Sequence, residues 1–202
     1  MTFWDIVAPL YDTFEVFNKA YRQMINKVRD LIPQEANVIE LACGTGNVSL
    51  AISDKANKVL CTDISDSMLK TASKKARKRN ISNIEFEKAS IFETGKHDNS
   101  FDVVIASQIL HLLDEPKQAC NEIKRITRDI AIVPIPLVRE GTNWGKFLIK
   151  LYKVFGFKPK YDFDNDSCKI FLEEIGFNDC EYHTIYGAVS LGVAVWKKAT
   201  KI

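Results

Sequence analysis

The sequence lacks a marked excess of charge: 28 lysine and arginine residues are balanced by 26 aspartate and glutamate residues, for a formal net charge of +2. Such a balance gives no whole-protein field that would attract nucleic acid or an anionic membrane, so no nucleic-acid partner is expected. The longest stretch without a charged residue, 182–196, is too short and too polar to span a bilayer. Residues 1–5 lack the basic start of a secretory signal. We therefore expect a cytoplasmic protein without a transmembrane segment. Contact with a membrane surface is an alternative that the sequence leaves open.

The chain has few cysteines, and they are dispersed: Cys43, Cys61, Cys120, Cys168 and Cys180. An odd number without a C-x-x-C pair argues against a disulfide scaffold or a structural zinc site, and favours a reducing compartment. The three histidines are also dispersed and have no carboxylates at ligand spacing, so no metal site is expected.

No repeat, linker or low-complexity tract interrupts the 202 residues, so we expect a single domain spanning 1–202. Short apolar runs alternate with helical patterns, which is typical of a mostly parallel sheet with helices on both faces. Strands are expected at residues 37–42, 58–63, 84–88, 101–107 and 129–135, and each of the first four is expected to lead into a helix.

Helical spacing is clearest over residues 65–79, where Met68, Leu69, Ala72 and Ala76 form one apolar face. Further helices are expected at residues 14–31, from about Asn47, at 114–127 and at 167–175.

The end of the chain departs from this alternation. Two strand-like runs follow, residues 180–186 and 189–197. Only two residues, Gly187 and the one after it, separate them. Strands joined so closely must be antiparallel, because a parallel return needs a crossover of about a dozen residues or more. The predicted fold class is α/β, a doubly wound, mostly parallel seven-stranded sheet that ends in an antiparallel hairpin, with helices on both faces.

The strongest functional signal is the run VIELACGTGNVSL at residues 38–50, where a strand leads into a turn containing Gly44 and Gly46. Glycine lets the backbone turn sharply and approach a ligand closely, and open α/β sheets bind nucleotides at this place. Ser49 stands where a dinucleotide fingerprint has its third glycine, so a plain strand-to-helix turn is an alternative. Asp63 at the end of the next strand favours ribose binding over a helix cap, which Ser65 could equally supply.

These residues, with NSFDVV at 99–104 and SQILH at 107–111, resemble the S-adenosylmethionine-dependent methyltransferases of the seven-stranded fold. The resemblance is close over residues 4–127 and rests on architecture alone beyond them. It implies that S-adenosylmethionine is the cofactor, that S-adenosylhomocysteine is the product, and that the acceptor is a small molecule.

The resemblance also implies a set of residues around the cofactor. Glu40, Ala42 and Gly44 would surround its methionine part, and Asp63 would hold its ribose. Ser90 departs from the pattern, because many members have an aspartate there that receives the adenine amine, whereas a serine accepts one hydrogen bond. The expected cofactor contacts are Tyr11, Glu40, Ala42, Cys43, Gly44, Gly46, Asp63, Ile64, Met68, Ser90, Ile91, Ser107 and Gln108.

Two segments are expected to close over the acceptor: an N-terminal helical lid at residues 1–33 and a variable cap at 137–165. Residues 4–12, WDIVAPLYD, resemble the N-terminal segment of quinone-biosynthesis and related small-molecule methyltransferases, in which the tyrosine, here Tyr11, lies over the cofactor. The alternative is a helix that only patches the core. In the cap, the apolar face Phe147, Leu148, Leu151, Tyr152 and Phe155 predicts either a packed helix or a lid for an apolar acceptor.

Methyl transfer from a sulfonium needs alignment of the acceptor more than a dedicated catalytic residue. A weakly acidic acceptor would gain from a general base, and His111 after the fourth strand is the candidate; a structural histidine is the alternative. The absence of a Pro-Cys dipeptide and of an N/D-P-P-Y turn argues against base-carbon and exocyclic-amine methylation. An NAD(P)-dependent oxidoreductase and a non-catalytic cofactor-binding subunit remain as rival functions, and both a monomer and a homodimer are open.

Overall fold

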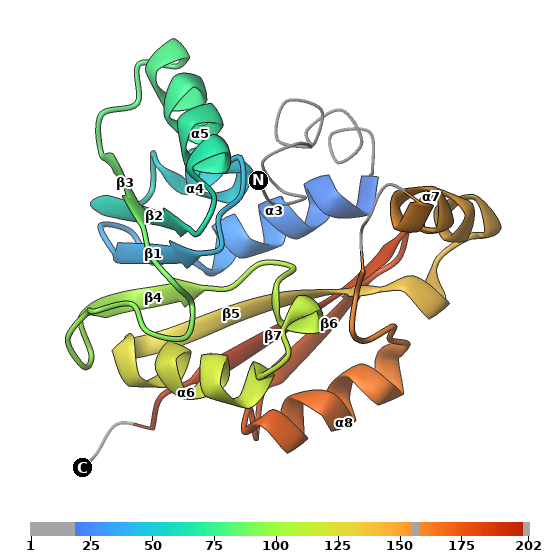
Figure 1. Ribbon diagram of the computed structural model, residues 1–202. Coiled ribbons are helices and arrows are strands. Elements are labelled where there is room, and N and C mark those ends of the chain that lie inside the picture. The colour runs from blue at the N-terminus through green and yellow to red at the C-terminus, as the bar shows by residue number, and fades with distance from the viewer. Residues whose placement is uncertain (1–18, 155–157, 200–202) are drawn as a thin grey trace.

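The computed structural model describes residues 19–154 and 158–199, with only the backbone of Leu148, Leu151, Tyr152 and Val154. Seven strands form one sheet in the order β3-β2-β1-β4-β5-β7-β6 (Figure 1). They are β1 (Asn37–Leu41), β2 (Lys58–Asp63), β3 (Ile84–Lys88), β4 (Phe101–Ile105), β5 (Thr127–Leu137), β6 (Glu181–Ile185) and β7 (Ser190–Lys197). The pairings from β3 through β5 are parallel, and β7 is antiparallel to both β5 and β6. The predicted fold class and closing hairpin are confirmed.

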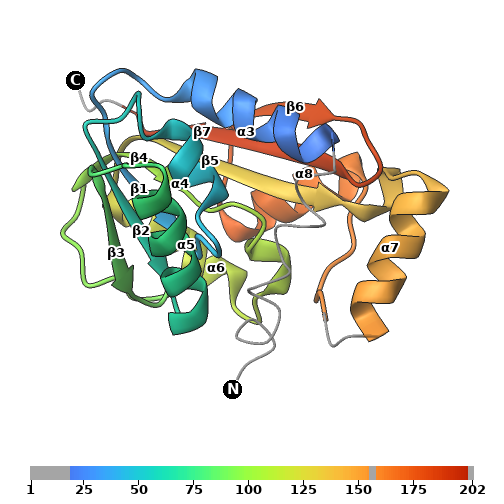
Figure 2. The ribbon, with the colours of Figure 1, turned by 90° about the horizontal axis from the view of Figure 1, so that it is seen from above.

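Helices cover both faces of this sheet (Figures 1 and 2). One layer contains α3 (Lys19–Leu31), α4 (Asn47–Ile52) and α5 (Asp66–Lys78), and the other contains α6 (Pro116–Ile126) and α8 (Asn165–Ile175). Two short 3-10 helices, η1 (Leu110–Leu112) and η2 (Val138–Glu140), and the helix α7 (Asn143–Val154) complete the described elements. The apolar faces of the two layers form two buried clusters, one on each side of the strands.

The helix α5 illustrates how the sequence sets these elements. The Ser65 hydroxyl caps its first turn by accepting a hydrogen bond from Met68 N at 3.2 Å. The four apolar residues expected to face the core, Met68, Leu69, Ala72 and Ala76, are all buried. Lysine and arginine occupy the last turn, where they complement the helix dipole.

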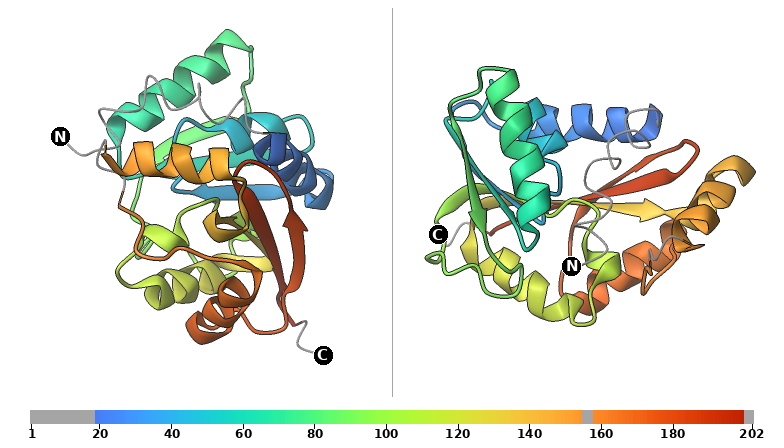
Figure 3. Two further views of the ribbon diagram at one scale, coloured as in Figure 1. Left: turned by 90° about the vertical axis from the view of Figure 1, so that its right-hand side faces the viewer. Right: turned by 45° about the horizontal axis from the view of Figure 1, so that its top comes forward.

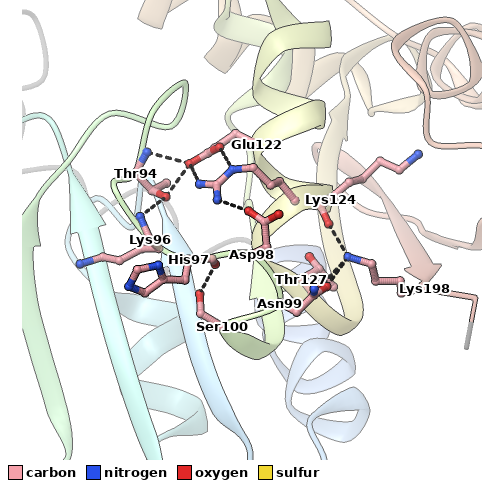
Figure 4. Close-up of polar contacts among 11 residues, drawn as sticks. Thr94, Lys96, His97, Asp98, Asn99, Ser100, Glu122, Lys124, Thr127 and Lys198 are labelled. Carbon is pink, nitrogen blue, oxygen red and sulfur yellow. Dashed lines mark hydrogen bonds and ion pairs between the residues drawn. The ribbon is translucent and has the colours of Figure 1, made fainter. Parts of the chain in front are cut away.

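One expected element is absent: the connection between β3 and β4, residues 89–100, contains no helix. Gly95 and Asn99 have left-handed φ values of 69° and 55°, which interrupt a helical path. Thr94 is instead tied to the other layer, because its N–H and hydroxyl donate to Glu122 Oε1 at 2.8 and 2.6 Å (Figure 4). Arg125 donates to the other oxygen of Glu122 at 2.7 Å. This contact orders the connection as an extended loop.

The strand β5 is longer than expected and contains Pro134 and Pro136. Both prolines pair in register with β7, whereas the pairing of β5 with β4 ends at Ile132. The Pro134 carbonyl accepts a hydrogen bond from Gln108 N at 2.8 Å, which places the backbone polar side of Pro134 toward β4. The missing N–H groups therefore lie beyond the end of β4, where no strand needs them.

Candidate active site

The strands β1, β2, β4 and β5 run parallel, so their carboxyl ends lie along one edge of the sheet. The glycine turn after β1, Asp63 at the end of β2, and Ser107 and Gln108 after β4 all meet this edge. In open α/β sheets, ligands bind at the carboxyl edge, where the strand order reverses. Here the reversal lies between β1 and β4.

The glycine turn has an unusual backbone. Ala42, Gly44 and Gly46 have left-handed φ values of 52°, 53° and 74°. The turn is held by hydrogen bonds from Cys43 N to the Thr62 carbonyl at 2.8 Å and from Gly46 N to the Cys43 carbonyl at 2.9 Å. A left-handed alanine costs about 1 kcal/mol or more and persists where its surroundings fix it.

The two glycines of the turn are required for different reasons. A Cβ placed on Gly44 would meet no heavy atom within 4 Å, so this glycine faces open space. A Cβ on Gly46 would lie 2.9 Å from the Cβ of Ala72, so this glycine lets α5 pack closely on the turn. Only Gly44 therefore leaves room for a ligand.

The Asp63 carboxylate joins the two loops at this edge. Its Oδ2 accepts from Gly44 N and its Oδ1 accepts from Ser65 N, each at 2.9 Å. The cap of α5 is provided by the Ser65 hydroxyl, so capping that helix is not the role of Asp63. A carboxylate has about four acceptor positions and can therefore accept several hydrogen bonds at once.

The Glu40 carboxylate is only 2% exposed and lies under the turn. Its Oε2 accepts from Ser49 N at 2.9 Å and from the Ser49 hydroxyl at 2.5 Å. Because Gly46 at the N-cap has no side chain, Glu40 satisfies the first turn of α4 in its place. Ser49, which replaces the third glycine of the dinucleotide fingerprint, is thus a partner of Glu40. Sequence reasoning did not identify this pair.

Four of the expected cofactor contacts, those that follow β2 and β3, differ in exposure. Ile64 is 57% exposed and presents apolar surface next to Asp63, whereas Met68 and Ile91 are buried at 2% and 6%. The Ser90 hydroxyl accepts from Phe92 N at 3.2 Å. Ile64 is therefore the most exposed apolar side chain among them, and the roles of all four at a cofactor stay predictions.

The two candidates after β4 lie where the chain turns away from the sheet. Gln108 has a left-handed φ of 54°, and its N–H is held by Pro134. The Ser107 hydroxyl oxygen is buried and makes no hydrogen bond within the described part of the chain. Buried hydroxyl groups normally have a hydrogen-bond partner, so the Ser107 hydroxyl at the carboxyl edge is suited to a hydrogen bond with a bound ligand.

His111 lies in η1 and is 3% exposed. Burial lowers the pKa of its ring to about 3, although the nearby Asp162 carboxylate acts in the opposite direction. The His111 carbonyl accepts from Lys160 N at 2.9 Å and from Tyr161 N at 3.3 Å, so the segment before α8 crosses η1. Asp162 was not singled out from the sequence, because no local pattern marks a carboxylate that reaches His111 from about fifty residues away.

Cys43 in the glycine turn lies against Cys61 of β2. Burial and this neighbour raise the pKa of the Cys43 thiol well above its usual value, so it stays protonated and is a poor nucleophile. Within residues 19–154 and 158–199 no group of three or more His, Cys, Asp or Glu side chains is placed to hold a metal ion. In the same part of the chain, none of the helices combines the length and hydrophobicity that a membrane crossing requires.

Tyr11 and the first eighteen residues of the proposed lid lie outside the described residues, as does Phe155 of the proposed cap face. The described part of the lid is α3, whose buried residues Ala20, Met24 and Val28 pack in the core.

Comparison with known proteins adds a family to this geometry. A family model described as a methyltransferase domain matches residues 32–139, just over half of the chain. A demethylmenaquinone methyltransferase of Leptospira interrogans is 24% identical, over 93% of this chain and 88% of that protein. Among solved structures, the [4+2]-cyclase SpnF has a TM-score of 0.76 at 17% identity, covering 98% of this chain and 94% of that one. Magnesium protoporphyrin IX methyltransferase from Synechocystis, with bound SAH, has a TM-score of 0.66 at 16% identity, covering 89% and 84%. At such identities the two structures show a shared fold alone.

Proposed function

Because the chain belongs to the methyltransferase-domain family, we propose that it transfers a methyl group from S-adenosylmethionine to a small, largely apolar acceptor. The observation that carries the proposal is the glycine turn locked to Asp63. Gly44 faces open space at the carboxyl edge, and its amide is fixed by Asp63 Oδ2. The name of the Leptospira relative supports a demethylated quinone precursor as the acceptor class.

The residues present fit this cofactor. The space in front of Gly44 would take the methionine part, the Asp63 carboxylate would accept from ribose hydroxyls, and exposed Ile64 would pack against adenine. When bound, S-adenosylmethionine would supply an electrophilic methyl group on a sulfonium. Glu40 supports this site indirectly, because it fixes the helix that begins directly after the turn.

The chain's own contribution is alignment of the acceptor and exclusion of water. The Ser107 hydroxyl at the end of β4 is a candidate to orient a polar atom of the acceptor. His111, with a pKa of about 3, is neutral at physiological pH and weakly basic. We assign His111 as a general base only if binding of the acceptor changes the surroundings of the imidazole. Otherwise its role is structural, because its backbone carbonyl holds the segment from Lys160 to Asp162.

Calorimetric titration tests the cofactor site. S-adenosylmethionine and S-adenosylhomocysteine should both bind, and NADH should not. Asp63→Asn should weaken both ligands by about 1–3 kcal/mol, because a charge-assisted hydrogen bond to the ribose becomes a neutral one. Asp66→Asn is the matched control. Asp66 lies three residues after Asp63, and its exposed carboxylate is paired with Lys88. Equal losses in the two variants, or binding of NADH alone, would remove the assignment.

A second measurement separates an enzyme from a cofactor-binding subunit. Formation of S-adenosylhomocysteine in the presence of a short-chain analogue of demethylmenaquinone is expected for the wild-type chain and should fall with Asp63→Asn. Cofactor binding without turnover on any of a panel of apolar acceptors would favour the non-catalytic alternative.

A further inference from the structure

The helix α7 lies at the same edge of the sheet as the proposed cofactor site, at the end of the molecule opposite α5 (Figures 1 and 2). It packs beside the turn between β6 and β7 (Figure 3). Thr142 N donates to the Ala188 carbonyl in this turn at 3.0 Å, and a Cβ on Gly145 would overlap that same carbonyl oxygen. The Gly145 side of α7 therefore faces the β6–β7 turn and is fixed against it.

A different side of α7 presents two aromatic residues to solvent. Trp144 is 63% exposed and Phe147 is 54% exposed, and their rings stack with centroids 5.6 Å apart. Tyr186, at the start of the β6–β7 turn, is 67% exposed. Exposed apolar side chains that gather in one place mark a surface that contacts something else.

All charged residues of α7 are basic. Lys146, Lys150 and Lys153 are exposed, and the helix contains no carboxylate. Lys153 is paired with Asp162 at 2.8 Å, so Lys146 and Lys150 carry most of the charge offered to a partner. A helix with aromatic residues on one side and lysines beside them suits the boundary of an anionic bilayer, where rings enter the head-group layer and lysines meet phosphates.

No other described helix combines these two features. The helix α5 carries several lysines, but none of its residues is a large exposed apolar one. The helix α8 exposes Ile170, but its charged neighbours include Asp166, Glu173 and Glu174. Charge alone and apolar exposure alone thus occur at other places on the molecule, which provides matched controls.

We propose that α7 is a docking surface for an anionic lipid bilayer, with Trp144 and Phe147 entering the head-group boundary and Lys146 and Lys150 contacting lipid phosphates. The purpose of this surface rests on the proposed function. Because α7 is connected by η2 to the carboxyl end of β5, docking would bring the cofactor edge toward the bilayer, from which an apolar acceptor would enter.

Vesicle co-sedimentation of the full chain tests the proposal. The wild type should bind vesicles of phosphatidylcholine with phosphatidylglycerol more tightly than vesicles of phosphatidylcholine alone. The double variant W144A/F147A should bind the anionic vesicles about tenfold more weakly or worse. The variant K146E/K150E should lose about thirtyfold or more, because each lysine near an anionic surface contributes roughly fivefold and the new carboxylates are repelled by it. The controls I170A and K74E/K78E should bind as the wild type does.

Several outcomes would overturn the docking surface. They are no binding by the wild type, equal losses in the control variants, and binding that does not depend on phosphatidylglycerol. A wild-type dimer that W144A/F147A converts to a monomer without loss of vesicle affinity would assign the surface to a second copy of the chain. Titration of S-adenosylmethionine into the same variants keeps the two proposals apart, since failure to bind cofactor removes the proposed function and leaves the vesicle result unchanged.

Discussion

At the carboxyl ends of β1 and β2, Glu40 and Asp63 are buried and hold neighbouring backbone groups in place. The helix α7, farther along the same edge, instead presents Trp144 and Phe147 to solvent. The first region suits a ligand whose shape does not change, because its polar groups are fixed before binding. The second suits a partner that varies, because few contacts inside the protein constrain its side chains.

In each region a glycine allows close packing. Replacing Gly145 in α7 should lower the free energy of unfolding more than the other substitutions. In Gly145→Ala the added Cβ would overlap the carbonyl of Ala188, so α7 must move away from the β6–β7 turn. We expect the free energy of unfolding to fall by about 3 kcal/mol, as for other overpacked sites. Urea denaturation measures it. Gly95→Ala, at a loop glycine with open space around it, should lose only about 1 kcal/mol of backbone strain; a loss as large as that of Gly145→Ala would contradict the account of α7.

Acid should affect two buried groups near these regions, His111 and Glu122, in separate pH windows. The pKa of His111, beside the cap segment, is lowered from 6.5 to about 3 by burial. The unfolded chain therefore binds a proton first, and stability falls as the pH drops from 6.5 toward 3. Between pH 6.5 and pH 5 the loss should be about 2 kcal/mol. His111→Asn should remove this slope, and Asn in place of the exposed His97 should leave it unchanged.

The Glu122 contact acts at lower pH. Burial raises the pKa of its carboxyl, but hydrogen bonds from Arg125 and Thr94 outweigh burial and lower the pKa from 4.5 to about 2. The stability from this group is complete above pH 4.5 and is lost as the pH falls toward 2. Glu122→Gln should flatten that part of the curve alone. If it changes the slope above pH 5 instead, Glu122 and His111 are coupled and do not titrate in separate windows.

The two glycines of the turn allow a finer test within the site. Gly46→Ala should lower the free energy of unfolding by between about 1 and 2 kcal/mol, because a Cβ would crowd Ala72 at a left-handed φ. Gly44→Ala should lose about 1 kcal/mol from its φ alone, yet it should lose more cofactor affinity than Gly46→Ala. Denaturation and calorimetry on the same pair decide this, and the reverse ranking of affinities would move the ligand away from Gly44.

Much of the fold was predictable because local patterns determine it. The strands follow short apolar runs, the buried face of α5 follows helical spacing, and the hairpin follows from the short connection at Gly187. The loop at residues 89–100 was not predictable, since its order depends on Thr94 meeting Glu122 from the other layer. The extension of β5 through Pro136 to Leu137 depends on β7, which comes much later in the chain.

The site was predictable in position but not in detail. The glycine turn and Asp63 were found because strand ends and glycines mark a carboxyl edge. The partnership of Glu40 with Ser49 was missed, because a buried carboxylate that caps a helix from the preceding strand has no spacing rule of its own. The burial of Ile91 and His111 depends on packing between layers, which sequence periodicity does not report.

The smallest expected effect concerns Ser90, where the chain departs from the pattern of many methyltransferases. The Ser90 hydroxyl already accepts from Phe92 N, and Ala89 N donates to the Asp63 carbonyl at 3.2 Å, which holds this loop beside β2. In Ser90→Asp one carboxylate oxygen can keep the Phe92 hydrogen bond while the other accepts from an adenine amine.

We expect Ser90→Asp to tighten binding of S-adenosylmethionine by about 1 kcal/mol, roughly fivefold, which is the lower end for a charge-assisted hydrogen bond. Repulsion from Asp63 works against this gain and keeps it small. Calorimetry with S-adenosylmethionine and S-adenosylhomocysteine measures the change, which should be equal for both because they share the adenine. Ser90→Asn, which has nearly the same size but no charge, should give less than half of the gain. Tightening of one ligand alone, or weaker binding of both, would place the adenine away from Ser90.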